Sequence, residues 1–176
     1  MTSRKFLTGV AFVLSGLAAN ASAAEPDGTV DFTGDIVDTP CIVSSDSTAL
    51  KVNLNKVKAS SFTTVGTASP DVNFQINLEQ CDITTKKNAQ VTFTGQADST
   101  NNKLLQITQG AGAATGVGIE LTDAAGTAFD LNGLSPETLL QTGNSELHFR
   151  AHYKSTLAAV TPGAANAQAQ FLVSYK

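Results

Sequence analysis

Two cysteines and two histidines are the residues of this 176-residue chain best suited to chemistry. His148 and His152 share the stretch "ELHFRAHYK", in which apolar and polar residues alternate as they do in a half-buried strand. Four residues of strand span about 13 Å at a rise of ~3.3 Å per residue, which is too far for the two imidazoles to share a metal ion. Both histidines are therefore expected to be exposed polar positions.

Other patterns for catalysis or ligand binding are also missing from the sequence. The glycine-rich "QGAGAATGVG" lacks the Lys-Ser/Thr ending of a phosphate-binding loop, and the scattered aspartates have no calcium-loop spacing. Two histidines are too few for a copper–zinc site of the dismutase type. We expect no catalytic residue, no cofactor, no metal site and no enzymatic activity.

The N-terminal residues predict export. Arg4 and Lys5 precede the apolar run "FLTGVAFVLSGLAA", and "NASAA" then offers a small-residue cleavage site after Ala23. This is the pattern of a secretory signal peptide over residues 1–23. The alternative, a membrane anchor, is disfavoured because the run is shorter than the roughly 20 residues that a bilayer needs.

Export sets the expected state of the cysteines and the charge of the mature chain. In an oxidising compartment an even pair is typical of a disulfide, so we expect a structural bond between Cys41 and Cys81. Removing residues 1–23 removes two of the eleven Lys and Arg and none of the fifteen Asp and Glu, so the mature net charge is 9 − 15 = −6. This balance disfavours a nucleic-acid partner. The remaining 153 residues (176 − 23) have the length of one domain.

Period-two alternation runs through the mature chain and predicts strands with one buried face. Breaker-rich stretches such as "TGQADSTNNK" and "TDAAGTA" separate these strands. Many short strands in one domain favour an all-β antiparallel sandwich. In "SPETLLQT" we expect a helical turn, with Ser135 as N-cap and Pro136 at its first position. The strands are expected over residues 52–54, 72–78, 91–93, 117–121, 147–153 and 169–175.

Both ends of the mature chain carry strand patterns without an evident partner. In "GTVDFTGDI" the apolar positions are Val30, Phe32 and Ile36, and Gly34 occupies the same register. In "TPGAANAQAQFLVSYK" the alternation continues to the final residues. An apolar edge strand is an aggregation hazard that proteins usually cover. An ordinary sandwich with its last strand at an edge is the alternative.

The spacing of these features resembles the subunits of chaperone–usher pili, most closely the major shaft subunit of type 1 fimbriae. The resemblance covers essentially the whole chain. It rests on the signal peptide, on "GDIVDTPC" before the first cysteine, on "LEQCD" around the second, and on "TPGAANA", which places Gly163 fourteenth from the C-terminus. Tyr175 as the next-to-last residue completes it.

The resemblance implies an incomplete immunoglobulin-like sandwich that a donor strand from a neighbouring subunit completes. Residues 24–38 would be the donor-strand extension and residues 39–176 the pilin domain. Donor residues entering the neighbour's groove would be Val30, Phe32, Gly34 and Ile36. The groove and its contacts with a chaperone or neighbour would involve Gly163, Phe171, Val173 and Tyr175.

The resemblance also implies partners and a location. The subunit would polymerise with copies of itself into a fimbrium on the bacterial cell surface that supports adhesion, after passing a periplasmic chaperone and an outer-membrane usher, and would share the fibre with adaptor and adhesin subunits. Two alternatives stay open. One is a minor adaptor, a tip-proximal pilin or a receptor-binding adhesin, although no length remains for a lectin domain. The other is a secreted sandwich that never polymerises.

Overall fold

The computed structural model describes residues 27–176 and divides the chain into two units, Met1–Ile36 and Val37–Lys176. The expected signal peptide, residues 1–23, lies outside the described residues. Within the described part, no helix is both long enough and apolar enough to cross a membrane.

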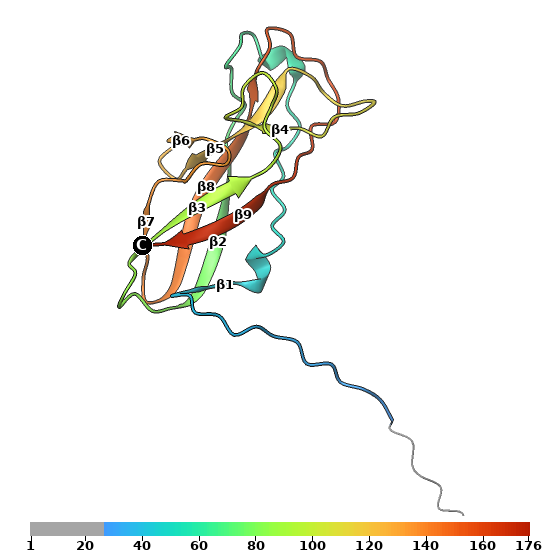
Figure 1. Cartoon of the computed structure of the whole chain (residues 1–176). Coiled ribbons are helices and arrows are strands. Elements are labelled where there is room, and N and C mark those ends of the chain that lie inside the picture. The colour runs from blue at the N-terminus through green and yellow to red at the C-terminus, as the bar shows by residue number, and fades with distance from the viewer. Residues whose placement is uncertain (1–26) are drawn as a thin grey trace, which may run out of the picture. The chain divides into compact units, whose positions relative to one another are not determined.

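Val37–Lys176 forms two antiparallel sheets, as the alternation predicts (Figure 1). The larger sheet has the order β1-β2-β8-β5-β4, with β6 also paired to β5. Its strands are β1 (Ile42–Val43), β2 (Val72–Cys81), β4 (Leu105–Gln106), β5 (Val117–Asp123), β6 (Ala128–Phe129) and β8 (Gly143–Ser155). The smaller sheet, of order β7-β3-β9, contains β3 (Asn88–Thr94), β7 (Thr138–Leu139) and β9 (Gln170–Tyr175). Two short 3-10 helices, η1 (Ser45–Ser47) and η2 (Ala59–Ser61), complete the elements.

Aromatic side chains join the two sheets into a sandwich. Phe74 on β2 and Phe149 on β8 are cross-strand partners in the larger sheet, and Phe93 projects from β3 in the smaller one. The ring centroid of Phe93 lies 5.9 Å from that of Phe74 and 5.2 Å from that of Phe149, both in edge-to-face geometry. Ile76 and Leu147, paired in the same register, are buried beside them. The alternation of these strands therefore places one face of each sheet in a shared core.

The disulfide expected between Cys41 and Cys81 is present. Both cysteines are buried, and the bond lies next to the pairing of β1 with β2. It ties the residues that enter the domain to the end of the longer strand.

A predicted strand is missing at residues 52–54. Val52 and Leu54 lie in a segment, residues 49–57, whose backbone makes no hydrogen bond to other backbone groups within the described part of the chain. Its one local bond is from the Asn55 N–H to the Asn53 side-chain oxygen, and Asn55 has a φ of 60°. The apolar alternation is real, but no strand of the described residues pairs with the segment to make it part of a sheet.

The helical turn expected in "SPETLLQT" is also wrong. Thr138 and Leu139 form β7, which pairs with β3. Ser135 does not cap a helix, because its hydroxyl accepts the Val91 N–H at 2.9 Å and its own N–H donates to the Val91 carbonyl at 2.8 Å. Hydrogen bonding to β3 satisfies these groups better than a single isolated turn would.

The expectation of two exposed histidines is right for His148 and wrong for His152. The His152 side chain is 7% exposed, with Nδ1 2.8 Å from an Asp71 oxygen and Nε2 3.0 Å from a Glu120 oxygen. Lys154 binds the other Glu120 oxygen at 2.7 Å. Because β8 is the central strand of its sheet, neighbours on both sides cover the imidazole even on the outward face. A buried polar group is tolerated when it is paired in this way.

Candidate functional site

Strand β9 is bonded on one edge only. It pairs with β3 in the register Phe93↔Phe171, Val91↔Val173 and Ala89↔Tyr175, and it is the terminal strand of its sheet. Among residues 27–176, no strand pairs with its other edge. That edge, called here the open edge, therefore presents N–H and C=O groups that no strand pairs with.

The side chains along the open edge point toward the core but are not covered. In the preceding segment and in β9, every second residue is only half-buried while it packs against the core. These residues are Ala165, Ala167, Ala169, Phe171, Val173 and Tyr175. Their partners on β3 are fully covered: Ala89 is 1%, Val91 0% and Phe93 6% exposed. The hydrophobic core is thus complete beneath β3 and incomplete along β9.

A second unpaired segment, residues 49–58, lies between η1 and η2. Figure 1 shows it on the side of β9 away from β3. Its inward side chains, Leu54 and Val57, are half-buried against the core, whereas Leu50 and Val52 are 38% and 36% exposed. Like the open edge, it combines free backbone groups with partly covered apolar side chains. We call residues 49–58 the facing segment.

Hydrogen bonds fix the C-terminal end of β9. The Tyr175 hydroxyl donates to the Cys41 carbonyl at 3.4 Å, and Lys86 Nζ donates to the Tyr175 carbonyl at 3.0 Å. Burial raises the pKa of the Tyr175 hydroxyl above its ordinary value. Tyr175 therefore links the open edge to the region of the disulfide.

Gly163 lies where the chain turns toward the open edge. Its lack of a side chain allows the backbone of another loop to approach closely. Its neighbour Ala164 accepts the Ala114 N–H at 2.9 Å, and a Cβ on Gly163 would overlap the backbone of Ala113 and Ala114. Gly163 is exposed and does not belong to the half-buried row. Its geometry gives it a part in positioning that row.

We expect Gly163→Ala to destabilise the domain by about 1–3 kcal/mol, because the backbone at Ala113 and Ala114 must move to admit the methyl group. Urea unfolding of the subunit in its purified chaperone complex, in which the extension is not inserted into a neighbour, measures the loss. Gly28→Ala is the matched control, since nothing lies within 4 Å of the position of its Cβ. Equal midpoints for the two variants would contradict the close-approach role.

The four residues expected in a donor strand are exposed and unpaired. Residues 27–36 contain no strand, and Val30, Phe32 and Ile36 are 75%, 93% and 105% exposed. No atom lies within 4 Å of the position of a Cβ on Gly34. The segment thus presents large apolar side chains at three of four alternate positions, and Gly34 leaves a gap at the third.

Sequence reasoning missed several residues of this site. Ala165 and Ala167 extend the half-buried row beyond Phe171 and Val173, and the same period-two signal reached them in the sequence. Leu54 and Val57 were harder to find, because Asn55 with its positive φ breaks the alternation between them.

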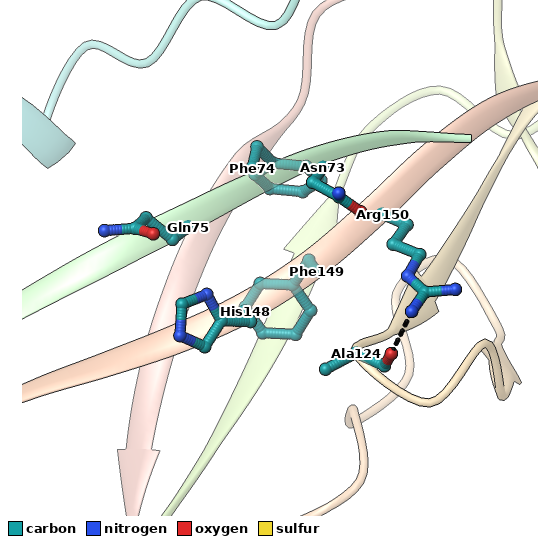
Figure 2. Close-up of a pocket in the computed structure, with 7 residues that line it drawn as sticks. All are labelled: Asn73, Phe74, Gln75, Ala124, His148, Phe149 and Arg150. Atoms are coloured by element: carbon teal, nitrogen blue, oxygen red, sulfur yellow. Dashed lines mark hydrogen bonds between the residues drawn. The ribbon is translucent and has the colours of Figure 1, made fainter.

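A surface hollow also lies on the outer face of β2 and β8 (Figure 2). Its polar lining includes His148 and Arg150. Figure 2 shows the Arg150 guanidinium donating to the Ala124 carbonyl, and Asp71 lies 3.5 Å from another of its nitrogens. Within residues 27–176 no three His, Cys, Asp or Glu side chains gather as a metal site. The open edge, not this hollow, is the feature that lacks a partner.

Comparisons with known proteins agree with this architecture. The family model described as "Fimbrial protein" matches residues 30–176. The probable major fimbrial subunit LpfA of Escherichia coli O157:H7 is 45% identical and covers 97% of this chain and 98% of its own. The type-1 fimbrial protein A chain of Escherichia coli is 39% identical, covering 98% of this chain and all of its own. A solved chaperone–usher pilus structure, described for rod uncoiling, matches with a TM-score of 0.70 and 28% identity, over 88% of this chain and 99% of that one.

Proposed function

This chain belongs to the fimbrial protein family, and we propose that it is a structural subunit of a bacterial surface fimbria that polymerises by donor-strand exchange. The observation that carries the proposal is the half-buried row along β9 opposite fully buried partners on β3. A fold that ends its core in this way needs one further strand. Residues 28–36 of another copy have the pattern to supply it.

Insertion of that strand would satisfy the open edge. Its N–H and C=O groups would bond to those of β9, each bond adding about 1 kcal/mol net, and its apolar side chains would cover Phe171, Val173 and Tyr175. This is strand addition, in which the main chain gives affinity and alternate side chains give specificity.

The donor side contributes burial. Covering Val30, Phe32 and Ile36 at about 1.5–3 kcal/mol each gives roughly 5–9 kcal/mol before entropy costs. Gly34 would mark the place where the groove is too shallow for a side chain, as strand glycines do at close backbone approaches.

The same geometry gives a fibre. Each copy would use one surface to donate and a different one to accept, so the contact is heterologous and does not close into a ring. We assign residues 1–23 to a signal peptide, 24–38 to the donor-strand extension and 39–176 to the pilin domain.

The proposal includes transient partners. A periplasmic chaperone would cover the open edge before assembly, and an outer-membrane usher would pass subunits to the cell surface, where adaptor and adhesin subunits share the fibre. The subunit is assigned a structural, non-enzymatic role in adhesion. A relative named as a probable major fimbrial subunit favours the shaft over a minor adaptor or tip position.

Immunogold electron microscopy of cells that express the subunit with its chaperone and usher tests this function. We expect label along the whole fibre. Label only at tips would favour an adaptor or adhesin. A soluble monomer that keeps its stability after residues 24–38 are deleted would overturn donor-strand exchange, because such a domain needs no further strand.

A further inference from the structure

Charge is distributed unevenly between the extension and the two segments that border the open edge, which are the facing segment and residues 161–176. Residues 24–38 carry five acidic residues, Glu25 and four aspartates, and no Lys or Arg. The facing segment carries Lys51, Lys56 and Lys58 and no acidic residue, and residues 161–176 add only Lys176. These two bordering segments are therefore basic. The mature chain as a whole is acidic, with a net charge of −6 from nine Lys and Arg (11 − 2) and fifteen Asp and Glu.

Among residues 27–176 these charges have no ion-pair partner. Neither the three lysines of the facing segment nor the aspartates of the extension form an ion pair among the described residues, whereas Lys103, Lys154 and Lys176 all do. Lys51, Lys56 and Lys58 are exposed, as are Asp31 and Asp35. Both sets are thus free to pair with another molecule.

Alternation in the extension and burial in the facing segment put the two sets on the same face of the completed sheet. In the extension the apolar residues occupy even positions, so Asp31 and Asp35 point away from the core when Val30 and Phe32 point into it. In the facing segment Leu54 and Val57 are the half-buried positions, which leaves Lys56 and Lys58 outward. A strand inserted between β9 and the facing segment would bring these side chains to neighbouring strands.

We propose that the facing segment is an electrostatic docking wall, a basic surface that attracts the extension of a second copy. In it Lys51, Lys56 and Lys58 would pair with Asp31 and Asp35. This inference rests on the proposed function and adds how the correct strand is selected. Backbone bonding is indifferent to sequence, whereas opposite charges on neighbouring strands favour one partner and like charges oppose it. The wall speeds docking by attracting the acidic extension before insertion.

Peptide uptake measures the effect. The acceptor is the full-length mature subunit purified as its chaperone complex, and the probes are fluorescent peptides of residues 27–38. Four peptides are compared: the native sequence, Asp31→Asn/Asp35→Asn, Asp31→Lys/Asp35→Lys, and Gly34→Leu. Each is offered to the native acceptor and to a Lys51→Glu/Lys56→Glu/Lys58→Glu acceptor. The rate of forming a peptide–subunit complex is followed at 10 mM and 1 M NaCl.

On the native acceptor at 10 mM NaCl, we expect the native peptide to enter about tenfold faster than the Lys-substituted peptide, from two cross-strand charge pairs. The order should reverse on the Glu-substituted acceptor. At 1 M NaCl, where charges are screened beyond about 3 Å, the rates should converge. The Asn-substituted peptide, which keeps Asp27 and Asp38, should differ between the two acceptors less than the native peptide does, and its uptake also reports whether the substituted acceptor is folded.

The charge-substituted peptides test the docking wall, and the Gly34→Leu peptide tests donor-strand exchange. Equal rates for the native, Asn-substituted and Lys-substituted peptides on the native acceptor at low salt would overturn the docking wall and leave donor-strand exchange standing. Uptake of the Gly34→Leu peptide as fast as the native one would instead overturn the proposed function. The peptide comparison on the native acceptor tests the docking wall by itself, so the test stays decisive even if the substituted acceptor misfolds.

Discussion

A Gly34→Leu subunit is expected to fold and to bind its chaperone, but to form few or no fibres. In the isolated chain this position is open, with no atom within 4 Å of a Cβ, so a side chain costs the subunit's own fold nothing. In a neighbour's groove the same side chain would meet backbone. The measurement is the amount of chaperone–subunit complex in the periplasm together with the fibre mass per cell.

Thr33→Leu is the matched control for this variant. It adds a similar side chain one residue away, on the face that carries Asp31 and Asp35. We expect fibre mass close to that of the native subunit. Fibres of normal length and heat resistance from Gly34→Leu would refute the assignment of this strand to a neighbouring groove. If the segment belonged to its own sheet, Gly34→Ala would instead be neutral or stabilising by about 0.5–1 kcal/mol.

Loss of the disulfide should have the second large effect. The bond closes a loop with a sequence separation of 40 residues, for which the chain-entropy model gives about 4 kcal/mol of stabilisation. A Cys81→Ser subunit is therefore expected to accumulate poorly in the periplasm, as quantitative immunoblotting would show. The structural reason is local, because Cys41 precedes β1, and its carbonyl also accepts the Tyr175 hydroxyl near the open edge.

The Cys41→Ala/Cys81→Ala double variant separates loss of the bond from exposure of a reactive thiol. We expect it to accumulate as poorly as the single variant. Normal accumulation of the double variant would assign the defect to the unpaired thiol. Two free thiols in mature fibres, detected by non-reducing mass spectrometry, would show that the bond has no role in the assembled protein.

The long strands were predictable from sequence because each has one buried face, which gives the alternation, and at least one neighbouring strand to pair with. Alternation located β2, β3, β5, β8 and β9, and export predicted the disulfide. Alternation reports which side chains face a core but not whether a strand lies alongside. The segment containing Val52 and Leu54 therefore has a strand pattern, although no other backbone group among residues 27–176 bonds to it.

The predictions for His152 and Ser135 were wrong for a related reason. His152 alternates like an exposed residue, and its burial depends on Asp71 and Glu120, which lie far away in sequence. Ser135 before a proline has a helix-start pattern, but its bonds go to Val91 on β3. Pairings between distant residues decided both cases, and a local pattern carries no information about them.

The candidate site was partly predictable. Phe171, Val173 and Tyr175 followed from period two, and the structure shows them half-buried along an unpaired edge. The reason for glycine at Gly163 did not follow, because it is the approach of Ala113 and Ala114 from another loop.

The combination of one open edge and one extension on every copy also fixes the stoichiometry of the proposed fibre. A fibre of n copies contains n − 1 donated strands, so one extension and one open edge are always left over. They lie at opposite ends, and the fibre is therefore polar, with chemically different termini. At one terminus Val30, Phe32 and Ile36 have no groove, and at the other β9 still needs an occupant. Elongation and termination must act on different surfaces, and a subunit that begins or ends the fibre must lack, or have covered, one of the two.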